Sequence, residues 1–145
     1  MRTITVGSLL LWLAASCFGQ GQTPLCPRHI EPPGYPRIAR VAHVTGKLVL
    51  SVTIDADGHV ADAELTNESR LTGLLKKGAL SNMRRWTFTK PPSAPYKETI
   101  VYDYEIDDSL PLDDPNTYVK FDLPDRVTIS TSGTSVQTSR PANNN

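Results

Sequence analysis

The sequence has little of what an enzyme active site needs. It contains no Gly-X-Ser-X-Gly motif. Cys26 has only His29 near it, in a proline-rich stretch that cannot hold a base at hydrogen-bond distance from the thiol. We therefore predict no catalytic residue, and nothing in the sequence implies a cofactor.

Metal ligands are equally sparse. The chain has three histidines, which show neither i,i+4 spacing nor a paired cysteine ligand: His29, His43 and His59. Asp55 and Asp57 before Gly58 resemble the start of a calcium loop. Such a loop needs a further ligand before the glycine and a glutamate at its twelfth position, where this sequence continues as a strand pattern. We predict a turn here and no metal site.

The chain also lacks an excess of positive charge, since its formal net charge is zero. Residues 26–102 carry eleven Lys and Arg against seven Asp and Glu, whereas residues 103–145 carry three against eight. A modest positive balance without a basic stripe falls short of a nucleic-acid-binding surface. We predict no nucleic-acid partner, and the acidic end could lie against the more basic middle of the chain.

No apolar run is long enough to span a membrane comfortably. Residues 4–15 are apolar, while a spanning helix needs about 20 residues. Arg2 precedes this run and small residues follow it, which is typical of a signal peptide. We predict a signal peptide at residues 1–19 and export to the periplasm, with retention of the signal as an anchor left open.

The chain has only two cysteines. Cleavage after Gly19 would remove Cys17 and leave Cys26 as a lone thiol in an oxidising compartment. Alternatively, residues 13–17 form an imperfect lipobox, which makes Cys17 a candidate lipidation site. The leucine lies one position too early for that motif, so release is favoured.

Composition divides the rest of the chain into a linker, a domain and a tail. Residues 20–34 are predicted to be a proline-rich linker without apolar periodicity, so that ordered structure begins near Tyr35. Pro36 suits the first position of a short helix that ends before Gly46. The domain extends over residues 35–106.

Two strands and a turn follow the short helix. Residues 47–54 alternate apolar and polar side chains, and residues 59–66 alternate again after Asp55–Gly58. This pattern predicts a β-hairpin. A third alternating stretch at residues 98–106 follows the proline-rich segment 90–95 and predicts the last strand of the domain.

The main helix is predicted between Leu71 and Trp86, because apolar residues recur there at helical spacing. They are Leu71, Leu74, Leu75, Ala79, Met83 and Trp86. The stripe of Leu74, Leu75, Met83 and Trp86 is predicted to pack against the sheet and form the core. Pro91 and Pro92 prevent further helix. The order α-β-β-α-β predicts an α+β fold, in which a small three-stranded, mainly antiparallel sheet packs against two helices.

The tail, residues 107–145, is acidic and then rich in Ser, Thr and Asn. Within it, residues 118–129 are β-prone and could form extra strands or an extended arm. The end of the chain, residues 130–145, has almost nothing to bury, and we expect it to be disordered.

Several segments of the domain together resemble one known family. In order they are Tyr35–Arg40, Gly46 with the strand after it, the turn Asp55–Val60, and Met83–Phe88 before a last strand. Over residues 35–106 this succession resembles the TonB C-terminal domain family. Each piece alone is common, but the combination in this order and spacing is specific.

The resemblance implies a periplasmic module that binds outer-membrane receptors and takes part in TonB-dependent transmembrane transport. Binding would occur by addition of a short extended peptide to the sheet edge, and the last strand, residues 98–106, is the predicted open edge. The partner-binding residues implied are Pro33, Tyr35, Pro36, Thr99, Val101 and Asp103.

The chain departs from the family pattern in two ways. A membrane helix and a long spacer are not evident in the sequence, so energy transduction does not follow. The β-prone stretch 118–129 could cover the same edge within the chain or bridge to a second copy, giving a homodimer. An alternative function is therefore an envelope structural or adaptor protein that self-associates through this fold without transducing energy.

Overall fold

The computed structural model describes residues 24–67, 69–70 and 72–134. The predicted signal peptide and Cys17 lie outside these residues, as does most of the predicted disordered end. The prediction of disorder was wrong for the start of that end, because Ser130 and Thr131 belong to β7 and Thr131 and Ser132 are fully buried. The elements are β1 (Pro27–His29), α1 (Arg37–Val41), β2 (Gly46–Ile54), β3 (Val60–Leu65), α2 (Gly73–Met83), β4 (Thr87–Phe88), β5 (Tyr96–Ile106), β6 (Thr117–Asp122) and β7 (Arg126–Thr131).

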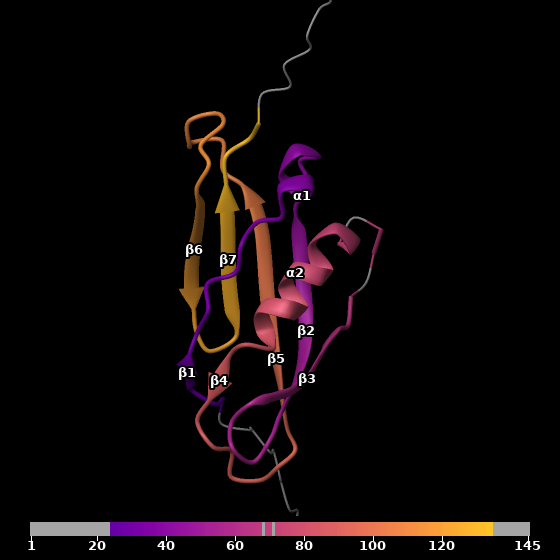
Figure 1. Cartoon of the computed structure of the whole chain (residues 1–145), viewed down its shortest axis with the longest axis vertical. Helices are drawn as coiled ribbons and strands as arrows, with labels where there is room; N and C mark the ends of the chain where they lie inside the picture. Colours follow the sequence, from indigo (N-terminus) through magenta and orange to yellow (C-terminus); the bar gives the residue numbers. More distant parts are fainter. Residues whose placement is uncertain (1–23, 68, 71, 135–145) are drawn as a thin grey trace, which may run out of the picture.

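The main sheet has five strands in the order β3-β2-β5-β7-β6. The predicted α+β class is confirmed, and β3, β2 and β5 form the predicted antiparallel unit. The tail adds two strands, because β7 pairs with β5 in parallel and β6 pairs with β7 antiparallel. Helix α2 lies on the same face of the sheet as the chain segment that leads from β1 to α1 (Figure 1).

Alternation in the strands places one set of side chains in the core, as predicted. In β2 the fully buried residues are Leu48, Leu50, Val52 and Ile54. In β5 they are Ile100 and Tyr102, joined by the almost completely buried Tyr104. Successive strand residues point to opposite faces, so a period of two in the sequence becomes one apolar layer facing α2.

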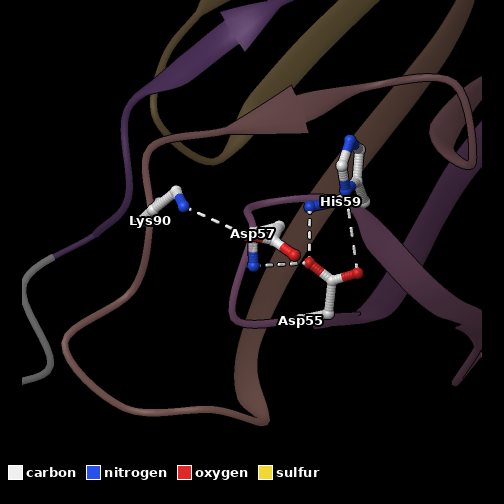
Figure 2. Close-up of polar contacts among 4 residues, drawn as sticks. All are labelled: Asp55, Asp57, His59 and Lys90. Atoms are coloured by element: carbon white, nitrogen blue, oxygen red, sulfur yellow. Dashed lines mark hydrogen bonds and ion pairs between the residues drawn. The ribbon is translucent and has the colours of Figure 1, made fainter.

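The turn between β2 and β3 confirms the turn interpretation of Asp55–Gly58. One Asp55 carboxylate oxygen accepts hydrogen bonds from the backbone N–H groups of Asp57 and His59, each at 2.9 Å (Figure 2). The His59 N–H is the main cause that holds the pKa of Asp55 below its usual value. Asp57 is 3.0 Å from the Lys90 ammonium, so both carboxylates are engaged in local contacts.

Gly58 is the position where the hairpin tolerates no side chain. Its φ is +91°, and a Cβ there would collide with the backbone carbonyl oxygen of Phe88. Its own carbonyl accepts the Phe88 N–H at 2.8 Å, which ties the turn to β4.

We expect Gly58→Ala to lower the free energy of unfolding by about 2 kcal/mol or more, since left-handed backbone alone costs a side chain about 1–2 kcal/mol. Urea denaturation of both proteins measures it. Gly73→Ala is the control: nothing lies within 4 Å of the added Cβ. It should leave stability equal or higher by up to about 1 kcal/mol. Equal stability of Gly58→Ala and wild type would contradict the prediction.

Helix α2 buries a narrower stripe than predicted. Leu75, Ala79 and Met83 are fully buried, and Trp86 just after the helix is 1% exposed. Leu74, in contrast, is 41% exposed. The placement of Leu74 in the core was therefore wrong. The buried residues recur every four positions and share one side of the helix, whereas Leu74 lies about 100° away around the axis. Leu71 lies outside the described residues.

The segment predicted as a linker packs against the domain where the structure describes it. Leu25 and Pro33 are buried, and β1 pairs with β4. The Glu31 carbonyl accepts hydrogen bonds from the Asn82 amide at 2.8 Å and the Trp86 indole at 3.0 Å. Ordered structure thus begins well before Tyr35, because the extended chain finds hydrogen-bond partners on α2 and just after it, and covers apolar surface.

Candidate functional site

Strand β5 is not a free edge over its C-terminal half, and the prediction of an open edge along residues 98–106 was wrong there. Residues Val101–Ile106 pair in parallel with Arg126–Thr131 of β7. The Val101 N–H donates to the Asp125 carbonyl at 2.7 Å, and the Asp107 N–H donates to the Thr131 carbonyl at 2.8 Å. Of the two arrangements considered for the tail, the structure shows coverage within the chain.

Apolar contacts hold the β6–β7 hairpin in place. Val127 and Ile129 are fully buried, and the Phe121 ring lies 6.1 Å from the Trp86 ring, centroid to centroid. Burying a side chain of the size of Val or Ile contributes about 1.5–3 kcal/mol. Detaching the hairpin therefore costs several kcal/mol, which makes it a resident part of the sheet.

The N-terminal half of β5 remains open on the side of β7. Pairing with β7 begins at Val101, and among the described residues Tyr96–Ile100 have only β2 as a strand partner. The Val101 N–H points toward β7, so in an alternating strand Lys97 and Thr99 direct their backbone groups to the same side. These two exposed residues form the open part of the edge.

Glu98 lies between them and points its side chain toward the N-terminal segment. Its carboxylate is 3.5 Å from the Leu25 N–H. Burial raises the pKa of Glu98, and the nearby Asp125 carboxylate raises it further against the opposing effect of the Leu25 N–H. The open edge thus ends beside two carboxyl groups.

Tyr35 is part of the core and does not line an open surface. Its hydroxyl donates to the Val44 carbonyl at 2.6 Å, and its ring packs edge-on against Tyr104 at a centroid distance of 5.3 Å. Burial raises the pKa of Tyr35 to about 12. Pro33 is buried and Pro36 is half-buried just before α1. Of the three, Tyr35 lies beside the half of β5 that β7 covers, through its contact with Tyr104.

The six predicted partner-binding residues do not form one exposed surface. Asp103 is 8% exposed, and its carboxylate is 3.4 Å from the Lys47 ammonium across the sheet. Val101 and Asp103 both lie opposite β7, at Arg126 and Thr128. Of the six residues, Thr99 alone lies on the open part of β5. It is separated from Tyr35, because Tyr35 packs against Tyr104, five residues further along β5.

The sequence predicted residues 118–129 only as one β-prone stretch that could cover β5 or bridge to a second copy. In the structure β6 forms one outer edge of the sheet, with β3 at the other. The available signal was the β-prone stretch itself, which alternates between Thr117 and Asp122. What the pattern could not reveal is that β7, the second strand of the stretch, inserts beside β5 and leaves β6 outermost.

These features define an α+β domain whose three-stranded antiparallel unit is extended by a C-terminal hairpin. The family model of the Gram-negative bacterial TonB protein C-terminal matches residues 31–106, and the chain belongs to this family. The family is one of partner-binding rather than catalytic domains. The match ends with β5, so the hairpin that covers this strand lies beyond the matched residues.

The solution NMR structure of the Pseudomonas aeruginosa TonB C-terminal domain is among the solved structures that are similar to this chain. It is 24% identical, covers 60% of this chain and 91% of that chain, and has a TM-score of 0.46. Among curated proteins none matches this chain. Within the part of the chain that the structure describes, no helix is long and apolar enough to cross a membrane.

Proposed function

We propose that this chain is a periplasmic TonB-type partner-binding protein that docks on an outer-membrane transporter by β-strand addition. Membership of the TonB C-terminal family supports the class of partner and a role in TonB-dependent transport. The observation that carries the mode of binding is the open stretch of β5 before Val101. The N-terminal signal pattern supports the location, and no catalytic group is required.

The stretch of β5 that is available for pairing with a peptide is shorter than the sequence predicted. A peptide strand that lies beside Lys97 and Thr99 satisfies the backbone groups that face outward there. This peptide ends next to the β6–β7 turn, residues Leu123–Asp125, because β7 pairs with β5 from Val101 onward. Pairing further along, at Val101 and Asp103, requires the hairpin to leave. The cost of exposing Val127 and Ile129 opposes that exchange.

A second candidate function is an envelope adaptor that uses the same fold without transducing energy. The observation that favours it is the hairpin itself, which occupies the half of β5 that the family resemblance assigns to the receptor peptide. In this case the partner is another envelope protein or a second copy of the chain.

Capture of outer-membrane proteins tests strand addition at the open part of β5. The mature chain is immobilised and incubated with outer-membrane extract, and bound proteins are identified by mass spectrometry. We expect Thr99→Pro to reduce recovery of transporters about tenfold or more, since proline removes the outward N–H. Thr99→Ala keeps the N–H and should bind as wild type does.

Three outcomes separate the alternatives. Loss with Thr99→Pro and retention with Thr99→Ala supports docking at this edge. Equal recovery of transporters by both variants places the docking site elsewhere. Recovery of envelope proteins other than transporters, with the same dependence on Thr99, favours the adaptor function. Circular dichroism of both variants verifies that they fold.

A further inference from the structure

The open part of β5 carries opposite charges on the two faces of the sheet. Strand residues alternate between the faces. Glu98 lies opposite the fully buried Val52 of β2, so its side chain is on the face that carries the core, here called the core face. Lys97 and Thr99 have their exposed side chains on the other side, the outer face. A carboxylate thus borders the open stretch on one face, and an ammonium group borders it on the other.

A second charge of the same sign accompanies each of these two. Arg126 is paired with Val101, which shares the outer face with Lys97 by alternation, so the exposed Arg126 borders the far end of the open stretch on that face. Burial raises the pKa of Glu98, and the nearby Asp125 carboxylate raises it further. Two cations therefore border the open stretch on the outer face, and two carboxylates meet on the side of Glu98.

These four charges have no ion-pair partner within the part of the chain that the structure describes. The ion pairs found there engage other residues. The Glu98 carboxylate has one long contact, 3.5 Å from the Leu25 N–H. A partly buried carboxylate without a cation is unfavourable, so a partner that supplies the cation gains from pairing with it.

Side chains must decide which strand fits this edge, because few backbone groups are available there. β5 continues beyond the start of β7 (Figure 1), and only Lys97 and Thr99 direct their N–H and C=O groups outward in that stretch. A residue of an added strand shares the face of the β5 residue that it lies opposite, with Cβ atoms about 4.5–5.5 Å apart. The residue opposite Glu98 is therefore within reach of its carboxylate.

We propose that the partner strand alternates basic and acidic side chains, with a Lys or Arg opposite Glu98 and an Asp or Glu on the outer face between Lys97 and Arg126. The inference rests on the proposed docking at β5 and specifies the chemistry of the docked segment. A shift by one residue exchanges the faces of the added strand and brings like charges together, which is unfavourable. The edge thus selects both the partner strand and its register.

NMR titration of the isotope-labelled mature chain with two synthetic peptides tests the proposal. Both peptides have blocked ends and carry Glu and Lys in equal number between terminal threonines, so their composition and net charge are the same. The first has the order Glu-Lys-Glu-Lys and presents one sign on each face. The second has the order Glu-Glu-Lys-Lys and mixes both signs on each face. We expect the first to shift the amide signals of Lys97 and Thr99 and to bind about fivefold more tightly.

Charge variants of the chain test the role of Glu98. Glu98→Lys puts a cation on each face and should abolish the preference for the alternating peptide. Glu105→Lys makes the same change at an exposed residue of β5 that lies opposite Ser130 of β7, and should keep the preference. Thermal unfolding verifies that both variants fold. Salt at about 1 M should reduce the preference, since the screening length falls to about 3 Å.

Three results would overturn the inference. They are equal affinity of the two peptides, a preference that Glu98→Lys leaves intact, and amide shifts that are absent from Lys97 and Thr99 or spread over all charged surfaces. Docking of a transporter on β5 is tested separately by the capture experiment. Thr99→Pro removes an N–H there and leaves every charge unchanged, so the inference and the proposed function can fail independently.

Discussion

Replacing Trp86 by alanine is expected to lower the free energy of unfolding by about 3–5 kcal/mol. The side chain is 1% exposed, and its ring lies within 6.2 Å, centroid to centroid, of Phe88, Tyr102 and Phe121. Its indole N–H donates to the Glu31 carbonyl at 3.0 Å. One residue thus joins the N-terminal segment, α2, the central strand and the C-terminal hairpin.

Denaturant unfolding of Trp86→Ala measures this loss. Leu74→Ala is the matched control, because the sequence pattern assigns Leu74 to the same helical stripe while the structure leaves it 41% exposed. Its effect should stay within about 1 kcal/mol, well below the cost of truncating a buried Leu. Equal losses for the two variants would show that the face of α2 is wrongly placed.

A charge in the hairpin core is expected to have the second large effect. Ile129→Asp places a carboxyl group where the side chain is fully buried, on the strand that covers β5. The loss of stability should exceed the about 2–5 kcal/mol typical of Ile→Ala, because the group is also deprived of water. The hairpin is then expected to detach while the rest of the domain stays folded.

Hydrogen exchange resolves this within a single strand. Amides of β5 that face β7, those of Val101, Asp103 and Glu105, should exchange faster in Ile129→Asp than in wild type. Amides that face β2, such as those of Ile100 and Tyr102, should remain protected. Ile129→Val serves as the control. In this variant both sets of amides should exchange at the rates seen in wild type. Unchanged protection at Val101 would show that the hairpin does not depend on Ile129.

The Ile129→Asp variant, in which the β6–β7 hairpin is detached from β5, also shows whether the hairpin affects partner binding. If the variant recovers more outer-membrane transporter than wild type, the hairpin competes with the partner for the same half of β5. If recovery is unchanged, docking uses only the open stretch at Lys97 and Thr99. The two results distinguish a competing strand from a permanent extension of the sheet.

Local patterns carried the prediction of elements, as particular segments show. The alternation of Leu48, Leu50, Val52 and Ile54 predicted β2 and its buried face, and Asp55–Gly58 predicted the turn. Both depend on interactions within a few residues of the chain. The period of α2 was equally visible, but which of Leu74 and Leu75 enters the core depended on the surface that the helix meets.

The sequence by itself determined the α+β class, the hairpin, the family resemblance and the β-prone character of the tail, because each rests on local spacing or composition. The tertiary structure alone decided the strand order. Insertion of β7 beside β5 pairs residues about 25 positions apart, such as Val101 with Arg126. It is stabilised by burial of Val127 and Ile129 against a core that forms only when the chain folds. That insertion closes half of β5 and makes β6 the outer edge.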